Sequence, residues 1–255
     1  MKEGKQVDIS SDFETKKTNY FARFAYSHFD SLQPHEKGEV LGHKGDLEIW
    51  RNVSEHCLVA SVFADILAEE LGLEKEQREA VVEAAMLHDW FKKYEVKAMG
   101  VVEKEGKLDL RKMEEIKRED QRLLQEMGIP EDIINLAGAN IPETTQGPKT
   151  LSEKIIWYVD AMLSDTEPVS IAKRFKDLKM GWDGQKENPE RARRNAVFSD
   201  LYKERYDDKS LFEVQQEVGE KIGTEFKRLL NYTGEVDDLP FFLKEILIEK
   251  INISK

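Results

Sequence analysis

The sequence holds a single cysteine, no long apolar run and no excess of positive charge. Because Cys57 is alone, an internal disulfide and a zinc site made of cysteines are both excluded. No apolar run approaches the roughly 18 residues of a membrane span, and no signal peptide is recognisable, so we expect a cytoplasmic protein with no membrane partner. The formal net charge of −12 argues against a broad nucleic-acid surface, so any phosphate contact must come from a local cationic pocket.

Strand patterns, internal repeats and low-complexity segments are also missing, and signals for helices take their place. Charged residues make up 35% of the chain and hydrophobic residues 40%, which is the balance of a soluble globular protein. We therefore predict an all-α protein. Helices are expected within 12–32, in two segments of Trp50–Lys93, and over about 109–127, 130–140, 150–164, 189 onward, 210–232 and 239–253.

Local signals mark several ends of these helices. Gly72 and Gly128 can each end a helix in a left-handed turn. The runs Thr150–Glu153 and Ser210–Glu213 have the form of capping boxes, in which the first and fourth residues satisfy each other's main-chain donors. Pro189 suits the first turn of a further helix.

Two histidines and two aspartates lie on or beside otherwise apolar helix faces. His88 follows Val81 and Ala84 on one face, with Asp89 directly after it, and Asp160 lies one turn beyond an isoleucine of a third helix. His56 shares the face of its helix with Ala60, Phe63, Leu67 and Leu71. Such polar groups are costly to bury unless they are paired or bind a metal.

Imidazole and carboxylate ligands together suit a borderline or hard divalent metal, with water in the remaining positions. Adjacent residues of an α-helix point about 100° apart, so His88 and Asp89 can reach one ion only where the helix borders an open cavity. A bound ion of this kind can acidify water and neutralise a phosphate. The alternative is a buried polar network without metal.

The order His56, His88-Asp89 and Asp160 resembles the H…HD…D signature of the HD superfamily of metal-dependent phosphohydrolases. The flanking segments Asn52–His56, Ala84–Asp89 and Lys154–Asp160 are similar as well. The resemblance covers about residues 48–170. It implies an all-helical HD core and hydrolysis of a phosphate ester or anhydride.

The resemblance suggests three parts of the chain. Residues 1–47 would form an N-terminal helical arm and loop, 48–170 the HD metal-binding core, and 171–255 a C-terminal helical extension packed on the core. We expect one divalent ion per chain, either Mg or one of the transition metals Mn, Fe, Co, Ni and Zn, held by His56, His88, Asp89 and Asp160.

The segment from Thr144 to Asp160 is similar to the stretch before the last aspartate in HD-type diadenosine tetraphosphate hydrolases. Those enzymes carry extra histidines in the preceding helix and just before this loop. Here the corresponding neighbourhoods hold Glu119-Asp120 and the run Asn140–Glu143, without a histidine. A second metal is therefore not expected, because an all-oxygen ligand set would bind a transition metal weakly.

Lys92 stands three residues after Asp89, where several phosphodiesterase-like branches of the superfamily have lysine and the 5′-nucleotidase branch has an acid. We expect Lys92 to hold a phosphate oxygen beside the metal, with Lys93 and Arg51 as further substrate-binding residues. Glu55 is the candidate general base, together with Asp89 in catalysis. For Lys92, Arg51 and Glu55, a purely solvated role is the alternative.

Other polar residues have simpler interpretations. Glu143 is a second candidate base for which a solvent-facing position is favoured, and Cys57 is expected to be a small core residue. The remaining polar groups, interpreted as surface or partly buried side chains without a ligand, are His28, His35, His43, Arg191, Arg193 and Arg194.

The sequence therefore predicts a metal-dependent phosphohydrolase for a small phosphorylated metabolite, in particular a nucleotide. Two alternatives stay open. One is a catalytically silent HD module that binds a nucleotide and regulates a partner through its C-terminal helices. The other is an HD-type oxygenase with two irons, which needs more histidine ligands than the sequence offers. A homodimer is also left open.

Overall fold

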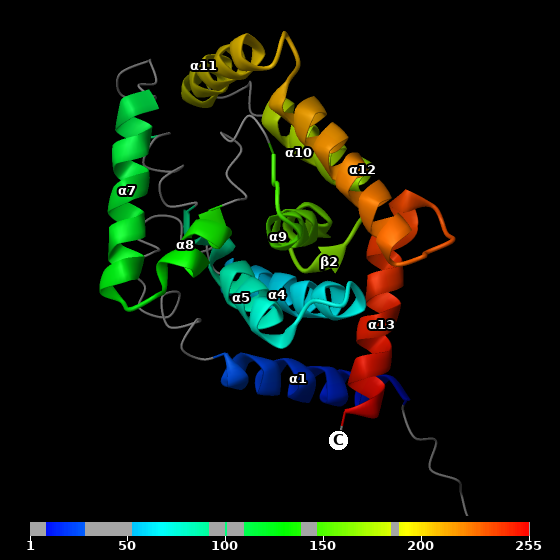
Figure 1. Cartoon of the computed structure of the whole chain (residues 1–255). Coiled ribbons are helices and arrows are strands. Elements are labelled where there is room, and N and C mark those ends of the chain that lie inside the picture. The colour runs from blue at the N-terminus through cyan, green and yellow to red at the C-terminus, as the bar shows by residue number, and fades with distance from the viewer. Residues whose placement is uncertain are drawn as a thin grey trace, which may run out of the picture.

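The structure is a computed structural model of the chain (Figure 1), and it describes residues 9–28, 53–91, 100, 110–138, 147–184 and 189–254. The elements of the first half are α1 (Ile9–Ser27), α4 (Val53–Glu70), α5 (Lys75–Leu87), the 3₁₀ turn η2 (His88–Phe91), α7 (Leu110–Glu126) and α8 (Glu131–Ala137). Those of the second half are α9 (Leu151–Ala161), β1 (Leu163–Ser164), β2 (Glu167–Pro168), α10 (Ile171–Gly184), α11 (Pro189–Arg205), α12 (Leu211–Leu229), η5 (Val236–Asp238) and α13 (Leu239–Ile253). The all-α prediction is confirmed.

The helix ends follow the local signals in the sequence. Thr150 and Ser210 each accept a hydrogen bond from the main-chain N–H three residues on, and Glu153 and Glu213 complete the two capping boxes. Gly72, with a φ of 72°, ends the turn after α4, and Gly128 does the same after α7 with a φ of 85°.

The centre of the molecule is formed by α4, α5 and α9. Helices α4 and α5 lie side by side, and α9 packs against both of them (Figure 1). Helix α8 covers α5 and joins it to α7, which stands at the edge of the molecule (Figure 1). The three central helices supply most of the fully buried side chains, among which Phe63, Ile66, Leu67, Leu87, Ile155, Ile156 and Tyr158 are 0 or 1% exposed.

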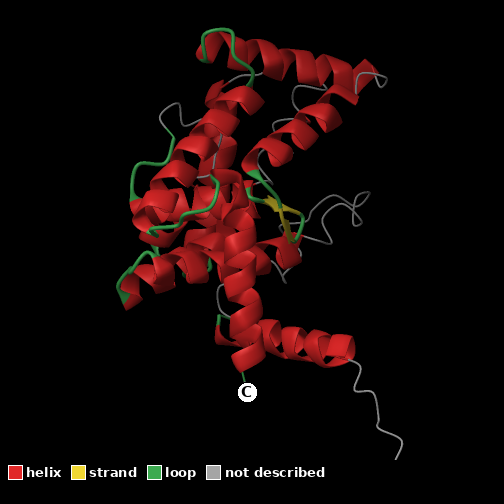
Figure 2. Ribbon diagram, turned by 90° about the vertical axis from the view of Figure 1, so that its right-hand side faces the viewer, coloured by secondary structure: helices red, strands yellow, loops and turns green. Residues whose placement is uncertain are grey.

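The later helices pack around this centre. Helix α12 contacts α9 and runs beside α10, while α13 contacts α4 and meets α1 at its C-terminal end (Figure 1, Figure 2). One hydrophobic cluster includes residues from the centre and from α10, α12 and α13. None of the described helices is both long and apolar enough to cross a membrane. The boundaries expected near residues 48 and 170 stay predictions.

A two-stranded hairpin interrupts the helices between α9 and α10, and the expectation of a chain without strands is wrong at this point. Leu163 pairs with Pro168 and Ser164 with Glu167 in antiparallel register (Figure 2). Strands of two residues are too short to show an alternating pattern. The hairpin therefore looks like a simple chain break in the sequence.

Two glycines of α12 allow a close approach to α9. A Cβ at Gly219 would lie 2.7 Å from a methyl carbon of Ile171 and 3.0 Å from the ring of Trp157. A Cβ at Gly223 would lie 2.8 Å from a methyl carbon of Val236 and 3.2 Å from the ring of Tyr158. Any larger residue at either position must push these neighbouring side chains away.

We therefore expect Gly219→Ala and Gly223→Ala to destabilise the fold, each by about 1–3 kcal/mol, the usual cost of overpacking. Gly181 is the matched control, because it lies exposed on α10 and a Cβ there meets nothing within 4 Å. Gly181→Ala should gain up to about 1 kcal/mol from helix propensity. Urea denaturation measures all three, and equal effects at the three positions would contradict the close α9–α12 packing.

Candidate metal centre

Three central elements each bring polar side chains to one point. His56 comes from the first turns of α4, and Asp160 from the last turn of α9. His88 and Asp89 open η2, where α5 tightens into a 3₁₀ turn. At this turn the histidine and the aspartate next to it face one centre.

The ligand atoms of these side chains converge. His56 Nε2 lies 3.2 Å from His88 Nε2 and 3.1 Å from Asp160 Oδ1. His88 Nε2 lies 3.4 Å from the same oxygen of Asp160 and 3.6 Å from Asp89 Oδ1, while Asp89 Oδ2 is 4.0 Å from His56 Nε2. The structure thus brings together the four residues that the sequence singled out, as a group that could hold a metal ion.

Main-chain carbonyls fix the protonation of both imidazoles. His56 Nδ1 lies 2.5 Å from the carbonyl oxygen of Asp165, and His88 Nδ1 lies 2.6 Å from that of Ala85. A carbonyl oxygen only accepts, so each Nδ1 must carry the proton that it donates. In the neutral rings, both Nε2 atoms therefore point lone pairs into the centre.

When both rings are neutral, the two Nε2 atoms and the carboxylate oxygens that face them are all acceptors. They lie 3.1–4.0 Å from one another, so protons on the imidazoles or a bound cation would stabilise the arrangement. Ligands about 2.1 Å from one ion stand about 3.0–3.4 Å apart at right or tetrahedral angles. The separations among His56, His88 and Asp160 match this range, so the donor set fits a divalent metal.

The centre is closed on most sides. The side chains of His88, His56 and Asp89 are 2%, 8% and 8% exposed, whereas that of Asp160 is 32% exposed. The approach from solvent therefore lies at Asp160.

The carboxylates of the centre raise the pKa values of both histidines. Burial alone would lower the pKa of His56, but its hydrogen bond to Asp160 and the nearby carboxylates raise the pKa above the ordinary value. Burial also opposes charge on His88, yet Cys57, Asp89 and Asp160 raise its pKa well above the ordinary value. Burial would raise the pKa of Asp160, but His88 and His56 hold it well below the usual range.

Cys57 was expected to be a core residue, and its position beside the centre was not predicted. Cys57 is fully buried, as expected of a core residue, and its Sγ also lies within 4.8 Å of a ligand atom of His88 and one of Asp89. Its position next to His56 in the sequence was the only signal. The carbonyls of Ala85 and Asp165 were not foreseen either, since main-chain acceptors leave no trace in residue type.

The other expected site residues are less well placed or lie outside the described part. Glu55 is exposed and lines a pocket of about 280 Å³ between α1, α4 and α13, to which none of the four cluster residues contributes. Glu119 is exposed on α7. The residues that fall outside the described ones are Arg51, Lys92, Lys93, Asn140 and Glu143, and nothing is described of the side chain of Asp120. Their roles stay predictions.

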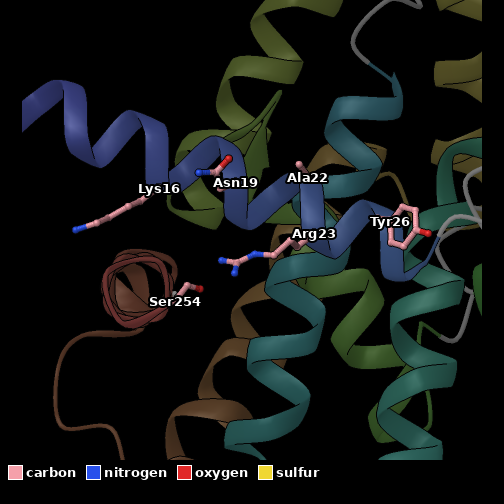
Figure 3. Close-up of a pocket in the computed structure, with 6 residues that line it drawn as sticks. All are labelled: Lys16, Asn19, Ala22, Arg23, Tyr26 and Ser254. Carbon is pink, nitrogen blue, oxygen red and sulfur yellow. The ribbon is translucent and has the colours of Figure 1, made fainter.

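A larger hollow of about 600 Å³ lies away from the metal centre, in the angle between α1 and the end of α13 (Figure 3). Arg23 of α1 points toward the end of α13 at Ser254, and the exposed Tyr26 closes the other side (Figure 3). The lining is open and exposed and shares no residue with the cluster. Volume alone therefore does not mark the functional site here.

Comparisons with protein-family models, with curated proteins and with solved structures found no match. The case for the metal centre accordingly rests on the geometry of the four side chains and on their motif, with which an HD-type site is compatible.

The raised histidine pKa values predict how metal-free protein responds to pH. A histidine whose folded pKa exceeds the unfolded value of about 6.5 contributes stability that is complete below that pH. The free energy of unfolding should therefore fall as the pH rises from about 6.5 through the raised pKa values of His56 and His88. Excess divalent metal should reverse this trend, because it binds the neutral rings of the native state.

Thermal denaturation of EDTA-treated protein between pH 6 and 9, with and without Zn²⁺, measures both effects. His88→Ala should flatten the two profiles, while His28→Ala serves as the control because His28 lies directly after α1 and bonds to Phe24 and Ser27. Metal-free protein that becomes more stable over this pH range would contradict the arrangement.

Proposed function

We propose that the protein is an HD-type metal-dependent phosphohydrolase that acts on a small phosphorylated metabolite, in particular a nucleotide. The observation that carries the proposal is the apposition of two Nε2 lone pairs, 3.2 Å apart, with Asp160 Oδ1 within 3.4 Å of both. Each ring is held in this tautomer by a main-chain carbonyl. Such a donor set suits a divalent ion and leaves room for water on the side of Asp160.

A divalent ion held by His56, His88, Asp89 and Asp160 would lower the pKa of water and offset the charge of a phosphoryl group. The protein contributes the orientation of both imidazoles and a largely closed centre, in which charges interact more strongly than in water. Asp160, as the exposed member, borders the space in which a phosphate would lie. Lys92, three residues beyond Asp89, is the proposed contact to a phosphate oxygen.

The described residues favour one ion per chain. Apart from His56 and His88, the only described histidine is His28, which lies directly after α1 and bonds to the carbonyl of Phe24. Among the described side chains, the second candidate ligand group consists of Cys57, His88 and Asp89, and it shares His88 with the first group. Because of this common residue, the second group extends the same centre. The described part of the chain thus offers no support for the two-iron alternative.

Hydrolysis of a phosphoester distinguishes the proposed enzyme from the alternative of a catalytically silent module. We expect wild-type protein to retain one divalent metal and to hydrolyse at least one member of a nucleotide panel supplied with Mn²⁺, Mg²⁺, Co²⁺, Ni²⁺ or Fe²⁺. His88→Ala and Asp89→Ala should each abolish metal retention and turnover, because each removes a ligand. Helical content should stay close to that of the wild type.

Elemental analysis, circular dichroism and phosphate release measure these three properties. His28→Ala is the control and should change none of them. Turnover that persists unchanged in His88→Ala would contradict the proposed enzyme. Metal retention without turnover on any phosphoester would instead favour the silent module.

A further inference from the structure

The two imidazoles of the centre are held by carbonyls of different origin. His88 Nδ1 bonds to Ala85, three residues earlier in the same helix, so the helix itself supplies that acceptor. His56 Nδ1 bonds to Asp165, which is 109 residues away in the chain. The orientation of His56 therefore depends on the tertiary placement of one turn.

That turn has an unusual backbone conformation. Asp165 is the first of two residues between β1 and β2, and its φ is 55°. L-residues seldom adopt this left-handed conformation; aspartate, asparagine and glycine tolerate it best, and β-branched residues worst. The side chain of Asp165 is exposed, so its contribution to the centre comes from the main chain.

The rest of the hairpin is anchored on several sides. Leu163 and Pro168 are buried, and the N–H of Val169 donates to the carbonyl of Met162 at 2.8 Å. Glu167 accepts from Lys244 of α13 at 2.7 Å. Because both strands are held, the left-handed turn determines where the carbonyl of Asp165 points.

We propose that Asp165 is a positioning residue of the metal centre, whose left-handed main chain aims a carbonyl at His56 and so keeps Nε2 of His56 free for the ion. The inference rests on the metal centre of the proposed function and not on any particular substrate. Without this acceptor, the proton of His56 would move between its two nitrogens and the ring would lose its fixed orientation. Partners of this kind typically change metal affinity by about 10- to 100-fold.

The test compares substitutions at Asp165 that accept or reject the left-handed conformation. Asp165→Gly keeps the backbone freedom and removes the carboxylate, so zinc affinity should stay within about threefold of the wild type. Asp165→Val disfavours a positive φ and should weaken zinc binding by about 10- to 100-fold. Competition with a chromophoric chelator measures both affinities.

Asp207→Val is the matched control. Asp207 is also an exposed aspartate with a positive φ, 51°, but it lies in the turn after α11 and outside the cluster. It should cost a similar amount of thermal stability and leave zinc affinity unchanged. The comparison separates a specific effect on His56 from general backbone strain.

The ring itself provides a direct readout. In zinc-loaded protein labelled with ¹⁵N-histidine, long-range ¹H–¹⁵N spectra should show a protonated Nδ1 and a zinc-bound Nε2 for His56. The Nδ1 proton should exchange slowly in the wild type and in Asp165→Gly, and quickly in Asp165→Val. The wild-type spectrum stands on its own if the valine variant fails to fold.

Three outcomes would overturn the proposal. They are a zinc-bound Nδ1 in the wild type, a loss of zinc affinity in Asp165→Gly equal to that in Asp165→Val, and an equal loss in Asp207→Val. A protein that shows the expected zinc binding and spectra but hydrolyses no phosphoester contradicts the proposed reaction and leaves the role of Asp165 intact.

Discussion

The central constraint of this structure is that acceptor atoms of two imidazoles and two carboxylates converge on one point. The Nδ1–H groups of His56 and His88 donate to main-chain carbonyls. In the neutral rings, both Nε2 lone pairs therefore face the carboxylates of Asp89 and Asp160. Either protons or a metal must neutralise this centre. In the metal-free protein, the raised pKa values of the two histidines show that the carboxylates favour protonation of these rings.

The surrounding helices serve to hold this costly arrangement in place. Helices α4 and α5 pack side by side, and α9 closes the centre from a third direction. Helix α12 braces α9 through the close approach at Gly219 and Gly223. In the hairpin after α9, the carbonyl of Asp165 accepts a hydrogen bond from His56. Lys244 of α13 donates to Glu167 and so links the hairpin to that helix. Elements far apart in the chain are thus joined at the metal centre by packing and hydrogen bonds.

Sequence patterns predicted most of the helices and the four residues of the candidate site, and what they missed has physical reasons. The helices and the four converging side chains followed from apolar periodicity, capping residues and the order of His56, His88, Asp89 and Asp160. The hairpin could not be predicted, because two-residue strands have no period. The acceptor at Asp165 is a main-chain atom, which any residue type would supply. Apart from its position next to His56, Cys57 gave no sign of facing His88, because its direction is set by how α4 and α5 pack.

We propose that a single divalent ion binds between the three central elements, at His56, His88, Asp89 and Asp160. Anomalous diffraction from crystals soaked in Mn²⁺ at slightly alkaline pH, where the imidazoles are neutral, tests it most directly. The account predicts one strong peak per chain, in contact with His56 Nε2, His88 Nε2, Asp89 and Asp160. A centre without a peak, or two fully occupied peaks within about 4 Å as in two-metal sites, would contradict it.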